Sequence, residues 1–134
     1  MTSTTPARPT SQPPRRLLPV VGRVPLAALL GVTIGVLGTV AHRAEWGDLP
    51  VGIVLALAIT LSAAVLCRAW AGMSTLLASG VGWVVAVQML SVEGPGGDVL
   101  VPAQTVGLVW TYGGLVLFAV TAFLPRRWFA DVAA

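Results

Sequence analysis

Five side chains with oxygen or nitrogen donors are the first candidates for chemistry in this sequence: His42, Glu45, Asp48, Glu93 and Asp98. Carboxylate and imidazole groups that gather in one place can bind a divalent cation. Their spacing matches no metal-binding motif, so we expect an acidic rim in water and neither a metal nor a cofactor. A bound cation at this rim is the alternative.

The chain has a single cysteine, Cys67. One thiol can form neither an internal disulfide nor a Cys-x-x-Cys redox pair, so thiol-based oxidoreductase chemistry is not expected. We expect Cys67 to be a small packing residue beside lipid, with palmitoylation as the alternative.

Catalysis or coupled transport inside a membrane usually requires an ionisable side chain within a span. The predicted spans of this chain hold none, and no nucleophile and base can be paired. We therefore expect a protein that is not an enzyme. A small transporter or channel for a neutral or lipid-like solute is the alternative, because hydroxyl groups could line a path. These hydroxyls can also bond to their own helices; they belong to Thr33, Thr60, Ser62, Thr75, Ser79, Thr111 and Thr121.

The composition indicates that lipid surrounds the elements that carry these residues. The 134 residues are 56% hydrophobic and 10% charged, whereas about a quarter of a soluble domain is charged. Between Asp48 and Glu93 more than forty residues contain one charge, Arg68. A single helix of that length would be about 65 Å long, roughly twice the hydrocarbon thickness of a bilayer. The chain must therefore fold back, and residues 67–72 combine Arg, Trp and Gly as a turn outside the lipid would.

Turn and charge signals divide the chain into four spans, which we place at residues 24–41, 49–66, 73–90 and 106–124. The predicted fold is an all-α membrane protein with four transmembrane helices arranged as two antiparallel hairpins. Its transmembrane domain covers residues 23–128. A disordered tail rich in Thr, Pro and Arg precedes it at residues 1–22, and a short tail follows at 129–134. Arg15 and Arg16 before the first span could alternatively belong to a twin-arginine export signal.

The distribution of arginine predicts the orientation in the membrane. Seven of the eight Arg residues lie on the side of the membrane that holds the two tails and the residue-68 turn, and only Arg43 lies in a loop on the other side. Cytoplasmic loops of membrane proteins carry an excess of basic residues. We therefore expect a multi-pass protein of the plasma (inner) membrane with both termini in the cytoplasm. No folded basic face for nucleic acid is expected. The predicted anchors at the lipid headgroups are Arg23, Trp46, Arg68, Trp70, Arg126, Arg127 and Trp128.

Small residues recur every four positions in the first two spans. Such stripes let helix backbones approach closely, and stripes on consecutive antiparallel helices predict that the first two spans pack directly together. They also predict association with a second copy or with a larger membrane protein. The residues are Ala27, Gly31, Gly35 and Thr39 in the first span, and Gly52, Ala56, Thr60 and Ala64 in the second.

Three short sequences carry a resemblance to a known group of proteins: Gly-Asp-Leu-Pro at residues 47–50, Cys-Arg-Ala-Trp at 67–70 and Gly-Asp at 97–98. Together with the Arg-only, Ala/Val/Leu/Gly-rich composition, they resemble small four-span actinobacterial integral membrane proteins of unknown function. The resemblance covers the spans and outer loops, and it implies the same four-span fold but no activity. The sequence favours a non-enzymatic structural or accessory subunit in the lipid bilayer.

Overall fold

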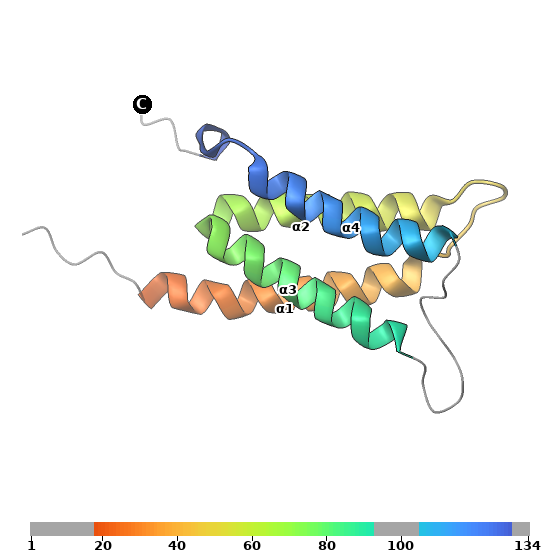
Figure 1. Ribbon diagram of the computed structural model, residues 1–134, viewed down its shortest axis with the longest axis horizontal. Helices are drawn as coiled ribbons and strands as arrows, with labels where there is room; N and C mark the ends of the chain where they lie inside the picture. The colour runs from red at the N-terminus through yellow and green to blue at the C-terminus, as the bar shows by residue number, and fades with distance from the viewer. Residues whose placement is uncertain (1–17, 93–104, 130–134) are drawn as a thin grey trace, which may run out of the picture.

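The computed structural model describes residues 18–92 and 105–129, which form a bundle of helices (Figure 1). Consecutive long helices run in opposite directions along the bundle. The described segments contain α1 (Leu18–Ala41), α2 (Val51–Ala71), α3 (Met73–Ser91), α4 (Thr105–Phe123) and the short 3-10 helix η1 (Arg126–Trp128). The disordered tail was predicted to cover residues 1–22, but α1 already begins at Leu18. The first 17 residues of the predicted tail lie outside the described part.

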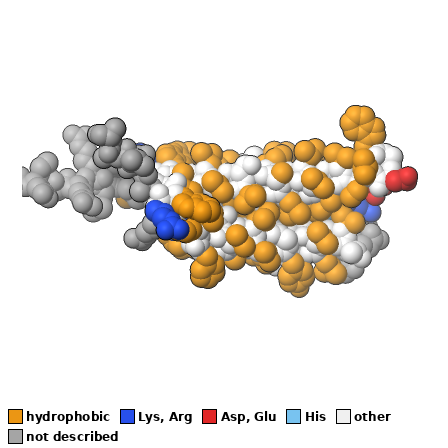
Figure 2. Space-filling model, turned by 90° about the horizontal axis from the view of Figure 1, so that it is seen from above, with side chains coloured by type: hydrophobic (Ala, Val, Ile, Leu, Met, Phe, Trp, Pro, Cys, Tyr) orange, Lys and Arg blue, Asp and Glu red, His pale blue; other side chains and the backbone are white. Residues whose placement is uncertain are grey.

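All four long helices are long and apolar enough to cross a membrane. Their apolar segments are 19 to 21 residues long, which corresponds to about 28–32 Å of helix against about 30 Å of hydrocarbon. Large apolar side chains cover the outside of the bundle, with Leu29 61% and Val81 62% exposed. Figure 2 shows this apolar surface between the two ends of the bundle. The chain is a multi-pass membrane protein.

The reversal between α2 and α3 is made by one residue, Gly72. Its φ of 79° and ψ of −140° lie in a region that is almost restricted to glycine. Because Gly72 alone turns the chain, α2 continues to Ala71, five residues beyond its predicted end at residue 66. The position predicted for Arg68, within the connecting turn, is therefore wrong: Arg68 lies in the last turn of α2 and is 6% exposed.

The most extensive helix contact joins α1 to α3, which are not neighbours in the sequence. The pairs α1–α2, α2–α4 and α2–α3 make intermediate contacts, α3 and α4 touch less, and α1 and α4 touch least. The helices therefore follow the order α1, α2, α4, α3 around the bundle. The second predicted hairpin, α3 with α4, is the most open side of this arrangement.

Glycines make the contact between α1 and α3 possible. A Cβ atom on Gly31 would overlap the backbone carbonyl of Ser79, and one on Gly82 would overlap the carbonyl of Ala28. A Cβ on Gly35 would lie 2.9 Å from Cβ of Ala86, again too close for two carbons. Small residues at these points bring the two backbones together, so dispersion contacts can hold the helices. We call this contact the α1–α3 seam.

The seam corrects the pairing predicted for the small-residue stripes. Gly31 and Gly35 face α3 instead of α2, while Gly52 approaches Ala41, the last residue of α1, and Ala44 in the loop that follows. The structure buries all eight stripe residues within the single chain: Ala27, Gly31, Gly35, Thr39, Gly52, Ala56, Thr60 and Ala64. Within the chain they pack its own helices together.

Candidate functional site

The centre of the bundle contains a buried group of aromatic rings, Trp83, Trp110 and Phe118, with His42 beside them. Trp83 and Trp110 meet edge to face, with ring centroids 5.2 Å apart at 64°. Phe118 lies 5.9 Å from Trp83, and the His42 ring stacks on Trp110 at 6.2 Å. Each such aromatic pair adds about 0.5–1.5 kcal/mol beyond simple burial. We call these four residues the aromatic cluster.

Two glycines make room for the two indoles. A Cβ atom on Gly38 of α1 would overlap the ring of Trp110, and a Cβ on Gly114 of α4 would overlap the ring of Trp83. The rings therefore lie directly against helix backbone. This close fit links α1, α3 and α4 around the aromatic cluster.

Hydrogen bonds fix the polar atoms of Thr39, His42 and Trp110. The indole Nε1 of Trp110 donates to Thr39 Oγ1 at 3.1 Å. The Nδ1 atom of His42 lies 2.6 Å from the carbonyl oxygen of Thr39. A carbonyl only accepts, so Nδ1 is the donor in this bond.

Two buried polar atoms of the aromatic cluster have no hydrogen-bond partner: His42 Nε2 and Trp83 Nε1. The described part of the chain holds no group of three or more His, Cys, Asp or Glu that could bind a metal. The prediction that His42 belongs to a water-exposed rim is wrong: it is 1% exposed, because its N–H extends α1 by bonding to Gly38 and Trp110 covers its ring.

The rest of the predicted acidic rim is only partly described. Glu45 and Asp48 are exposed in the loop after α1, whereas Glu93 and Asp98 lie outside the described residues. A polar cavity of about 270 Å³ lies beside this loop. Its lining consists of His42, Arg43, Ala44, Glu45, Pro50 and Val106.

At the opposite end of the bundle, Arg23 of α1 is held against the end of α2. Its Nη1 donates to the carbonyl oxygen of Trp70 at 3.1 Å, and its Cζ lies 5.7 Å from the centre of the Trp70 ring. The bond satisfies a carbonyl that the end of a helix leaves free. Arg23 therefore ties α1 to α2 at this end.

The other predicted headgroup anchors differ in exposure. Trp46, in the loop after α1, is 81% exposed, and Trp128 and Arg127 are exposed in η1. Arg68 is buried, and the side chain of Arg126 lies outside the described part. Exposed Trp and Arg at both ends suit the headgroup level of a bilayer.

The hydroxyls inside the helices bond mainly to helix backbone. Thr60 donates to Ala56 at 2.8 Å, and Thr121 donates to Leu117 at 2.8 Å. Thr75 donates to Cys67 across the turn between α2 and α3 at 2.5 Å, while Ser79 Oγ has no partner. Hydroxyls that are used in this way leave few groups to line a polar path.

The family described as "Family of unknown function (DUF6113)" matches residues 5–128 of this sequence. The chain belongs to the DUF6113 family. No curated protein and no solved structure matches it. The match agrees with the expected family of unknown function, whereas the actinobacterial source stays a prediction.

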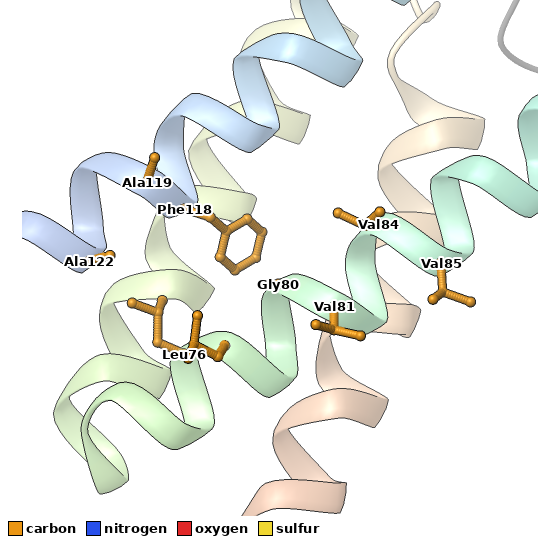
Figure 3. Close-up of a pocket in the computed structure, with 9 residues that line it drawn as sticks. Leu76, Gly80, Val81, Val84, Val85, Phe118, Ala119 and Ala122 are labelled. Atoms are coloured by element: carbon orange, nitrogen blue, oxygen red, sulfur yellow. The ribbon is translucent and has the colours of Figure 1, made fainter.

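An apolar indentation on the DUF6113 chain lies between α3 and α4, which make little contact with each other. It has a volume of about 320 Å³ and opens toward the lipid. Figure 3 shows Phe118 projecting from α4 toward Gly80 of α3, with Leu76 on one side and Val84 on the other. We call this indentation the α3–α4 groove, lined by Leu76, Leu77, Gly80, Val81, Val84, Val85, Phe118, Ala119 and Ala122.

The aromatic cluster of this family member was not predicted from the sequence. Tryptophan in a membrane protein usually marks the interface, but Trp83 and Trp110 lie within α3 and α4 and are fully buried. Their position inside two helices is a signal that could have identified them. The two glycines that receive the rings could be matched to them only in three dimensions.

Proposed function

We propose that this DUF6113 chain is a non-enzymatic structural or accessory subunit of the plasma membrane, with both termini in the cytoplasm. The observation that carries the proposal is the filled interior of the bundle. Trp83 and Trp110 are fully buried at its centre, and Phe118 packs against Trp83. A bundle filled in this way has the character of a rigid packing unit.

The same packing weighs against the alternative, a transporter or channel for a neutral or lipid-like solute. A path along the bundle axis would require the Trp83 and Trp110 rings to leave their contacts with helix backbone. Moving them would also break the bond from Trp110 to Thr39. The interior hydroxyls support the same conclusion, because Thr60 and Thr121 already bond to their own helices.

A partner of this subunit would bind the lipid-facing surface, because the small-residue stripes are used inside the chain. Helix association in lipid depends on close packing and not on removal of apolar surface from water. The α3–α4 groove offers more packing contact than a convex helix face and lies where the bundle is least closed. We therefore place one transmembrane helix of a larger membrane protein in this groove.

Co-purification from native membranes in mild detergent tests the role and the surface together. We expect a membrane protein to accompany the wild-type chain in fixed ratio and to be lost from Val81→Trp, which fills the groove. The matched control is Leu29→Trp, since Leu29 is equally exposed on α1 and lies outside the groove. Equal recovery with both variants would contradict the groove as the binding surface, and recovery of the chain alone from wild-type membranes would contradict the accessory role.

A flux measurement separates the accessory subunit from the transporter. The purified chain in proteoliposomes should release small neutral solutes and scramble labelled lipids no faster than protein-free vesicles. Flux that depends on the protein and changes with Trp110→Ala would favour transport through the bundle and overturn the proposal.

A further inference from the structure

Arg68 is a buried cation without an anionic partner in the described part of the chain. Its side chain is 6% exposed in the last turn of α2, and its Nε atom is buried without a hydrogen-bond partner. The ring of Phe129 lies 5.8 Å from its Cζ. A ring attracts the cation from one side but offers no hydrogen-bond acceptor in the guanidinium plane. Buried charges are normally paired, so the guanidinium requires an acceptor.

The surroundings of Arg68 indicate the charge and the source of this acceptor. The same end of the bundle carries Arg23 and the Arg127 of η1, and the acids that the structure describes, Glu45 and Asp48, lie in the loop at the other end. Figure 2 shows described acidic side chains at the end of the bundle away from Arg68. An end with this charge, at the level of the headgroups, attracts the phosphates of anionic lipids.

Arg23 is less suited to this role than Arg68. Its guanidinium already donates to the Trp70 carbonyl and lies over the Trp70 ring. The guanidinium N–H groups of Arg68 make no hydrogen bond to any described side chain. Their planar, paired arrangement matches the oxygens of a phosphate.

We propose that Arg68 binds the phosphate of an anionic phospholipid at this end of the bundle, with the Phe129 ring covering the face of the guanidinium. The lipid phosphate supplies the missing counter-charge for a cation that the helices bury. This site is separate from the α3–α4 groove and does not depend on the accessory role.

Titration of the purified full-length chain in neutral detergent tests the site, with phosphatidylglycerol as the probe and phosphatidylcholine as the zwitterionic comparison. Native mass spectrometry gives the dissociation constant, and thermal unfolding gives the stabilisation by lipid. We expect Arg68→Gln to weaken phosphatidylglycerol binding by about tenfold or more, as loss of a charge-assisted hydrogen bond does. Arg127→Gln, at an exposed position, should change binding by less than about threefold.

Three further arms distinguish a lipid phosphate from a carboxylate of the chain and from free phosphate as the partner of Arg68. Arg68→Lys keeps the positive charge but loses the planar guanidinium donors, so it should fold normally and bind phosphatidylglycerol several-fold more weakly. If Arg68→Gln does not fold, Arg68→Lys tests the site in its place. Asp131→Asn should leave binding and melting temperature unchanged. Inorganic phosphate should stabilise the chain much less than the lipid does.

The contrary results are equally defined. Wild-type affinity in both Arg68 variants, or equal affinity for phosphatidylcholine, would overturn the site. A fall in melting temperature without lipid that is the same for Asp131→Asn and Arg68→Gln would make Asp131 the partner of Arg68 and would also overturn it. If inorganic phosphate stabilised the chain as much as the lipid does, the ligand of Arg68 would be free phosphate, and the lipid site would be contradicted.

Discussion

Trp110 of α4 donates its indole N–H to Thr39 Oγ1 of α1 across 3.1 Å, and both side chains are buried. The contact is notable because α1 and α4 do not otherwise share an extended interface. One hydrogen bond between side chains 71 positions apart therefore helps to close the bundle around its aromatic cluster.

Replacing Thr39 with Val should destabilise the chain. The shape is nearly kept, but the buried indole N–H loses its acceptor, which costs about 1–3 kcal/mol. The melting temperature in detergent should fall accordingly. The control is Thr33→Val, since the exposed Thr33 bonds only to Leu29 of its own helix, and it should change little. Equal melting temperatures for the two variants would show that the bond to Trp110 contributes nothing.

The α1–α3 seam predicts opposite effects for two glycines of α1. Gly31→Ala places a methyl group on the Ser79 carbonyl, so α1 and α3 must separate and the chain should lose about 1–3 kcal/mol, as other overpacked sites do. A Cβ on Gly22 meets nothing within 4 Å, and Gly22→Ala should be neutral or stabilising by up to about 1 kcal/mol. Thermal unfolding of the two purified variants measures the difference. A stable Gly31→Ala variant would contradict the seam.

Gly72→Ala should be costly although space is available for its side chain. No atom lies within 4 Å of the added Cβ, so any loss comes from the backbone angles of the turn. Holding a non-glycine residue in such a region costs about 1–3 kcal/mol. The expected result is a lower melting temperature, with Gly22→Ala again as the control. A wild-type melting temperature would mean that the turn can adopt another conformation.

The orientation can be measured with single cysteines in a Cys67→Ser background. Trp46 and Trp128 are exposed at opposite ends of the bundle. A membrane-impermeant maleimide added to intact cells should label Trp46→Cys, and it should label Trp128→Cys only after permeabilisation. The reverse pattern would place both termini outside the cell.

Helix positions could be predicted from the sequence where strong signals bound them. Predicted span 73–90 agrees with α3 (Met73–Ser91), and span 106–124 agrees with α4 (Thr105–Phe123), within one residue at each end. The end of α2 was misplaced, because an Arg in an apolar stretch normally indicates the water side of the interface. The structure instead buries Arg68 and leaves the reversal to Gly72.

The helix partners could not be predicted from spacing alone. The four-residue stripes of the first two spans are alike, so they suggested each other as partners. The face of α3 that meets α1 has no such stripe. Its contact residues are spaced three, one and three positions apart along the sequence: Ser79, Gly82, Trp83 and Ala86. The burial of His42 was missed for a similar reason, since its cover, Trp110, is far away in the sequence.

The measurement that tests most directly whether the small-residue face of α1 is internal is disulfide formation between Gly35→Cys and Ala86→Cys. The Cβ positions are 2.9 Å apart, so a small shift gives the separation of about 3.5–4.5 Å that disulfides require. In a Cys67→Ser background, mild oxidation of native membranes should produce a bond within one chain, seen as a mobility shift at monomer mass. Bonded dimers from Gly35→Cys alone, without the shifted monomer in the double variant, would place this face between two molecules and contradict the account.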